Sequence, residues 1–97
     1  MSIAQTILAQ LGGGRFQAMT GARHFIDTGK GLTFQVPMTT TRNRCNAVRI
    51  TLENDLYEVE FIRMSKFSAK TLSKFENVYA DRLQSIFTDQ TGLDTHL

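Results

Sequence analysis

Hydrophobic and polar residues alternate through the middle of the chain, in two runs that cover residues 48–62. The apolar positions of these runs are Val48, Ile50, Leu52, Tyr57, Val59 and Phe61. A period of two residues predicts β-strands with one buried face. Asn54 and Asp55 separate the runs, and both residue types favour tight turns, so the sequence predicts a β-hairpin.

A turn centred on residues 54–55 also fixes the register of this hairpin. The predicted apolar pairs are Leu52 with Tyr57, Ile50 with Val59 and Val48 with Phe61. The same register places Arg49 opposite Glu60 on the other face, which is a favourable charge pair. A shift of one residue would expose the apolar set and separate the charges, so both patterns support one register.

The first residues of the chain predict two short helices. Residues 2–11 carry apolar side chains at helical spacing, and Ser2 with Gln5 resembles a capping box. The glycines at residues 12–14 stop this helix and are expected to form a flexible joint. A further helical turn or two can follow, for which Gly21 is a plausible C-terminal cap.

The predicted sheet begins at residues 25–26. A turn at residues 28–31 returns the chain into an alternating strand over residues 32–36. Pro37 cannot donate a backbone hydrogen bond, so it ends that strand or leaves it at an edge. Residues 38–46 are the longest polar connection, and we expect them to form an exposed loop.

The end of the chain predicts a long helix. Its apolar stripe consists of Leu72, Phe75, Tyr79, Leu83, Ile86 and Phe87. These residues recur at helical spacing, Ser73 and Glu76 can act as a capping box, and Gly92 lies where a helix would close. The preceding segment, residues 63–73, is ambiguous because apolar residues and regularly spaced lysines are mixed there.

These elements predict one α+β domain over residues 1–97, a three- to four-stranded antiparallel meander with N-terminal and C-terminal helices packed on one face. Hydrophobic residues make up 41% and charged residues 21%, as in ordinary soluble proteins. No apolar run approaches the roughly 20 residues of a membrane-spanning helix, and a signal-peptide pattern is missing. We therefore expect a cytoplasmic protein that does not bind membranes. Cys45 is the only cysteine and cannot form an internal disulfide, which agrees with a cytoplasmic protein.

The net charge is only +2, but its distribution is uneven, because residues 1–50 contain six basic residues against Asp27 alone. Side chains that could contact phosphates or an acidic protein surface are Arg15, Arg23, Lys30, Arg42, Arg44, Lys66, Lys70 and Lys74. They are scattered along the chain, so the sequence leaves open whether they form one patch.

No residue cluster has the spacing of a catalytic or metal site. His24 and His96 are the only histidines, and without cysteine or further histidine at ligand spacing we expect no metal and no cofactor. The glycine-rich segments lack the preceding strand and the Gly-Lys-Ser/Thr ending of a phosphate-binding loop. We therefore expect a non-enzymatic protein. Among the aromatic residues, only Phe16 and Phe67 lack a predicted core position and are candidates for stacking on bases.

The order of elements resembles the double-stranded-RNA-binding domain, which grips RNA with lysines at the start of its last helix. Lys70 and Lys74 occupy roughly that place in this sequence. The chain lacks the Gly-Pro-x-His loop and the Lys-Lys-x-Ala-Lys run of that family, so the resemblance is one of layout.

A second resemblance is carried by FQAMTGA (residues 16–22), DLYEVEF (55–61), VYADRL (78–83) and TGL (91–93). These stretches look like small orphan proteins encoded by bacteriophages and other mobile elements. Such proteins include anti-CRISPR inhibitors, which are non-enzymatic domains that bind bacterial CRISPR surveillance complexes and block target DNA. The resemblance implies a bacterial host protein or ribonucleoprotein complex as the partner, contacted through the charged loops.

Two classes of function therefore stand at this point. The first is a phage or mobile-element protein that blocks a host nucleoprotein machine by steric occlusion. The second is a module that binds nucleic acid directly, using the same basic side chains on phosphates.

Overall fold

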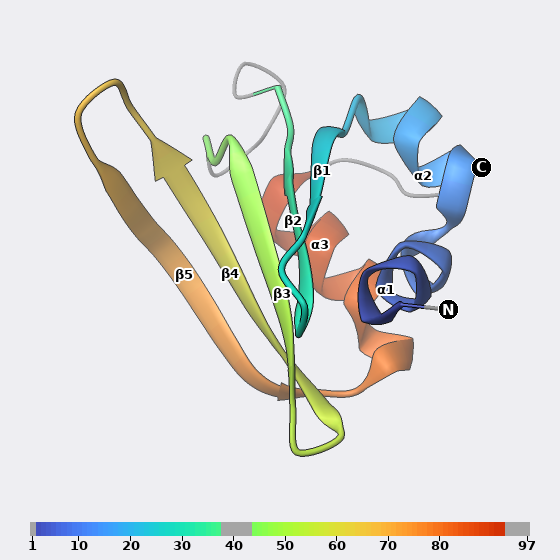
Figure 1. Ribbon diagram of the computed structural model, residues 1–97. Helices are drawn as coiled ribbons and strands as arrows, with labels where there is room; N and C mark the ends of the chain where they lie inside the picture. Colours follow the sequence, from blue (N-terminus) through green and yellow to red (C-terminus); the bar gives the residue numbers. More distant parts are fainter. Residues whose placement is uncertain (1, 38–43, 93–97) are drawn as a thin grey trace.

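The computed structural model describes residues 2–37 and 44–92, which form a layer of helices on one face of an antiparallel sheet (Figure 1). The elements in chain order are α1 (Ile3–Leu11), α2 (Gly13–Thr20), β1 (Arg23–Asp27), β2 (Gly31–Gln35), β3 (Ala47–Glu53), β4 (Leu56–Met64), β5 (Ala69–Val78), the 3-10 helix η2 (Ala80–Arg82) and α3 (Leu83–Thr91).

The strands form a simple meander in the order β1-β2-β3-β4-β5, and every neighbouring pair is antiparallel. The predicted α+β class is confirmed. The prediction of three to four strands is wrong, because the described residues form five. The additional strand is β5, which the sequence pattern had placed in an ambiguous segment and a helix.

The central hairpin has the predicted register. Ile50 pairs with Val59 and Arg49 pairs with Glu60. The other predicted apolar pairs, Leu52 with Tyr57 and Val48 with Phe61, are also present. Asn54 and Asp55 form a two-residue turn in which both have positive φ, at 50° and 68°. This turn type matches the twist of the strands, which explains why a short turn can join them.

The predicted C-terminal helix is confirmed in its second half, which is α3, but its start near residue 72 is wrong, because residues up to Val78 belong to β5. Two register irregularities in the β4–β5 pair cause the error. Between Tyr57 and Val59 the partner residue moves from Val78 to Phe75, so one extra residue bulges out of β5. Apolar residues of a bulged strand can therefore lie three positions apart on one face, which imitates helical spacing.

The helix termini follow the sequence signals more closely. Ser2 and Gln5 form the predicted capping box at the start of α1. Gly21 and Gly92 close α2 and α3 in the left-handed conformation, as predicted. Gly12 joins α1 directly to α2 with φ 127°, so the helix after the glycines begins earlier than the sequence indicated. The capping box predicted from Ser73 and Glu76 is wrong, since both lie in β5.

The core lies between the helices and the sheet, and three phenylalanine rings form its centre. Phe16 from α2 contacts Phe34 of β2 and Phe87 of α3, with ring centroids 5.4 Å and 5.1 Å apart. Phe16 is fully buried, so its prediction as an exposed stacking residue is wrong. Tyr79 shows the opposite error, because it was predicted in the core and is 63% exposed.

Replacing Phe16 by alanine should lower the free energy of unfolding by about 3–5 kcal/mol, because the cavity would open among buried rings. Urea denaturation followed by circular dichroism measures this difference. Phe67→Ala is the matched control, since that ring is 91% exposed and its loss should change the stability by less than about 0.5 kcal/mol. Equal effects of the two variants would contradict the assignment of Phe16 to the core.

The turn between β3 and β4 allows a second test. Asp55→Gly should be more stable than Asp55→Ala by about 1 kcal/mol, because glycine has no Cβ to oppose the positive φ of 68°. Both variants remove the carboxylate, so thermal unfolding of the pair isolates the backbone effect. An alanine variant as stable as the glycine variant would contradict the left-handed turn.

Candidate functional site

The far end of the β4–β5 hairpin extends beyond the rest of the sheet. The first residue of β3, Ala47, pairs with Ile62, whereas Arg63 and Met64 pair only with β5. We call residues 63–70 the arm. In Figure 1 the arm projects away from the helices at the upper left. None of its residues belongs to the hydrophobic core, so the arm is positioned by backbone pairing rather than by burial.

The tip of the arm is a tight turn that presents two adjacent side chains. The Ser65 N–H donates to the Ser68 carbonyl at 2.7 Å, and the two serine hydroxyls lie 3.0 Å apart. Lys66 and Phe67 occupy the turn between them. Phe67 is 91% exposed, and the Lys66 ammonium lies 5.6 Å from the centre of its ring.

The base of the arm is fixed by the side chain of Asn46. Its amide nitrogen donates to the Met64 carbonyl and its amide oxygen accepts from the Met64 N–H, both at 2.7 Å. The Asn46 N–H also donates to the Ile62 carbonyl at 3.0 Å. The amide therefore continues the hydrogen bonding of β3 past its first paired residue and holds the start of the arm in place.

Charges on the arm are paired differently from charges elsewhere in the sheet. Arg49 and Lys74 each lie opposite Glu60, on strands to either side of it. On the arm, Arg63 lies directly opposite Lys70. Like charges in directly opposed positions repel each other, so this pair disfavours the folded hairpin.

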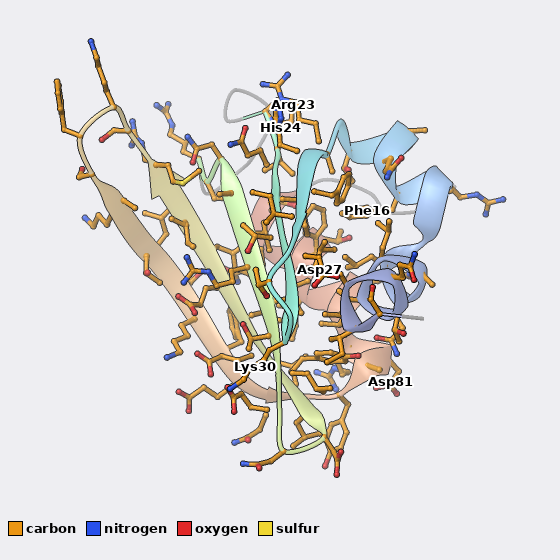
Figure 2. All side chains as sticks on the ribbon, viewed as in Figure 1. Phe16, Arg23, His24, Asp27, Lys30 and Asp81 are labelled. Carbon is orange, nitrogen blue, oxygen red and sulfur yellow. The ribbon has the colours of Figure 1, made fainter. Side chains whose placement is uncertain are left out.

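The meander brings further cations to the same end of the sheet. Antiparallel strands place the start of β1, the start of β3 and the end of β4 together. The cations there, which we call the basic end, are Arg23, Arg44, Arg63, Lys66 and Lys70. His24 lies beside Arg23, and Figure 2 shows both at the opposite end of the sheet from Lys30.

Most acidic residues of the sheet lie away from the basic end, and Glu60 lies midway along β4, opposite Arg49 and Lys74. Asp27, Glu53, Asp55, Glu58 and Glu76 all lie toward the opposite end of the described strands and turns. In the strands and turns that the structure describes, the basic end has no carboxylate. The sheet is therefore electrically polarised along its strands, although the whole chain carries only +2.

The structure thus divides the eight predicted binding residues. Four belong to the basic end: Arg23, Arg44, Lys66 and Lys70. Arg15 is exposed on α2, Lys30 lies at the other end of the sheet, and Arg42 is outside the described residues. Lys74 lies in the middle of β5 and is paired with carboxylates.

Arg63 is the member of the basic end that the sequence did not single out. The sequence signal for Arg63 was its place directly after the alternating run. Its position opposite Lys70 could be recognised only if β5 was predicted as a strand. Lys70 and Lys74 also lie in β5 and not at the start of a helix. The manner in which double-stranded-RNA-binding domains present their lysines is therefore not reproduced.

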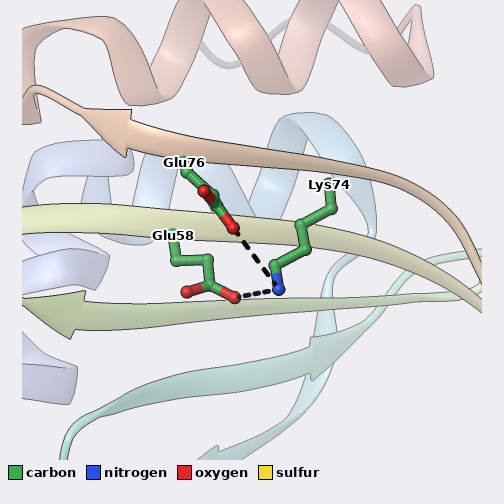
Figure 3. Close-up of polar contacts among 3 residues, drawn as sticks. All are labelled: Glu58, Lys74 and Glu76. Atoms are coloured by element: carbon green, nitrogen blue, oxygen red, sulfur yellow. Dashed lines mark ion pairs between the residues drawn. The ribbon is translucent and has the colours of Figure 1, made fainter.

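Lys74 forms an ion-pair cluster on the sheet (Figure 3). Its ammonium lies 2.8 Å from Glu58 Oε1 and 3.7 Å from Glu76 Oε1. The hydrogen bond to Glu58 raises the pKa of Lys74 above its ordinary value of 10.5, and the attraction of the nearby carboxylates adds to this. Lys74 is therefore neutralised by its neighbours and is poorly suited to bind an external anion.

The raised pKa of Lys74 predicts a pH-dependent stability. A lysine whose pKa is higher in the folded state stabilises that state while it is charged, and the effect is lost as the pH rises through the raised pKa. Lys74→Gln should therefore be less stable than the wild type at neutral pH, and the difference should decrease as the pH rises beyond 10.5 and through the raised pKa. Urea denaturation across this pH range measures it, and a constant difference would contradict the ion pairs.

Other parts of the surface offer little chemistry. One hollow among the described residues, about 290 Å³, lies between β5 and α3 and is lined by Phe75, Glu76, Asn77, Val78, Tyr79, Arg82 and Ile86. Among the described residues, no three His, Cys, Asp or Glu side chains gather where they could hold a metal ion. His96 lies outside those residues. None of the described helices is both long and apolar enough to cross a bilayer.

No protein-family model matches this chain, and neither does any curated protein or solved structure. Its function therefore has to be inferred from the chain's own residues, their charges and their placement.

Proposed function

We propose that this protein is a non-enzymatic nucleic-acid-binding module that contacts phosphates through the basic end. The observation that carries the proposal is the directly opposed pair of Arg63 and Lys70 on the arm. Each of these side chains lies opposite a like charge, whereas Glu60 in the same sheet lies opposite a cation on either side.

The unfavourable pair has a natural explanation in a polyanionic ligand. Repulsion between Arg63 and Lys70 lowers the stability of the free protein, and no described carboxylate of the strands relieves it. A phosphate backbone would supply the missing negative charge, and the counterions released from it would favour binding. Lys66 lies at the tip of the same arm, and Arg23 and Arg44 lie at the same end of the sheet, near the starts of β1 and β3, so they would extend the contact over several phosphates.

The proposal makes opposite predictions for two lysines of the same strand. Lys70→Gln should weaken binding to a labelled oligonucleotide about fivefold. The slope of log affinity against log salt concentration should become shallower by about one, which corresponds to the loss of one phosphate contact. The same change should leave the protein as stable as the wild type or slightly more stable, because it relieves the repulsion by Arg63. Fluorescence anisotropy at several salt concentrations, combined with urea denaturation, measures both effects.

Lys74→Gln is the matched control. It removes the same charge from β5, but the charge it removes is already paired with Glu58 at 2.8 Å. It should lower stability at neutral pH and leave binding nearly unchanged. Equal losses of affinity for the two variants would mean that only net charge matters, and the assignment of the basic end would fail.

A protein partner is the second candidate, and the outer edge of β5 favours it. This ten-residue strand pairs with β4 on one side only, so its other edge can accept a strand from a partner. Such a protein could occlude a bacterial nucleoprotein machine, for example a CRISPR surveillance complex, as expected for phage-encoded inhibitors. Affinity purification from bacterial lysate with and without nuclease separates the two candidates. A defined host assembly retained after nuclease treatment would favour the protein partner.

A further inference from the structure

We infer that Phe67 stacks on an unpaired base, so that the ligand of the basic end is single-stranded nucleic acid. This inference rests on the proposed function and names its ligand. It starts from the contrast between Phe67, which is 91% exposed, and the fully buried rings of Phe16, Phe34 and Phe61.

Folding does not explain a phenylalanine at this position. Two-residue turns favour glycine, asparagine, aspartate and serine, and an exposed ring gains nothing from burial. Phe67 contacts Lys66 next to it, and the arm contributes no side chain to the core. The ring is therefore available to a ligand.

The arm presents the ring in a defined position. The Ser65 and Ser68 hydrogen bonds close the turn, and the Asn46 amide fixes the base of the arm at Met64. The backbone beneath the ring is already ordered, so binding has to order only the Phe67 side chain, which favours stacking.

The surrounding charges fit the backbone of the same ligand. Lys66 lies beside the ring, and the opposed Arg63 and Lys70 lie three residues away along the two strands. Proteins that bind single strands combine an aromatic platform for a base with cations that follow the phosphates. In a duplex both faces of each base are already stacked, so Phe67 could reach one only by unstacking a step, at an energetic cost.

The test compares single-stranded and duplex oligonucleotides of the same length by fluorescence anisotropy, with DNA and RNA in separate arms. The wild type should bind the single strand more tightly than the duplex. Phe67→Ala should weaken single-strand binding about tenfold without changing the slope against salt, because a ring is lost and no charge is. Phe67→Trp should restore binding, and its fluorescence should be quenched when a base stacks on it.

Two controls separate stacking from other effects. Phe67→Leu keeps an apolar side chain without a ring and should not restore binding. Tyr79→Ala removes another exposed aromatic residue, 63% exposed and at the opposite end of β5, and should bind as the wild type does. The exposed position of Phe67 means that all its variants should fold, which circular dichroism checks.

The possible failures are distinguishable. If Phe67→Ala and the wild type bind equally while Lys70→Gln binds weakly, the proposed function stands and the stacking inference is wrong. If the wild type binds the duplex more tightly and Phe67→Leu retains that binding, the stacking inference is wrong, and residue 67 acts as an apolar wedge between base pairs. Failure of the wild type to bind any of the oligonucleotides would overturn both the inference and the proposed function.

Discussion

Burial of one face of the sheet determines where the other parts of the chain can lie. Phe34, on that face, packs against Phe16 from α2 and Phe87 from α3, with ring centroids 5.4 Å and 6.1 Å apart. Because rings from both ends of the chain must meet there, the N-terminal and C-terminal helices cover the same face. The β4–β5 hairpin extends past this core, so the arm lies outside it and has side chains that are not needed for packing.

The meander also converts a scattered distribution of charge into a polarised one. In an antiparallel meander the chain returns to the same end once for every pair of strands. Arg23, Arg44 and Arg63 occur near the points where it does so, and the arm adds Lys66 and Lys70 there. Most acids of the sheet occur near the alternate points, at the other end. Local charge density at the basic end is therefore much higher than the net charge of +2 indicates.

Two departures from simple folding rules lie in the candidate site. Lys70 opposite Arg63 and Phe67 at an exposed turn both act against stability. Elsewhere, the register of β3 and β4, the capping box at Ser2 and the closing glycines all agree with those rules. The occurrence of both on one short arm supports the proposed binding function.

The sequence by itself determined the α+β class, the β3–β4 register and most helix ends, because these depend on alternation, caps and turns that act over a few residues. Only the tertiary structure decided the identity of β5. Its bulges place Phe75 and Val78 three positions apart, as in a helix, and only the pairing with β4 shows that the segment is a strand. The same holds for the burial of Phe16 and for the basic end. Both depend on contacts between residues far apart in the chain, which no local pattern records.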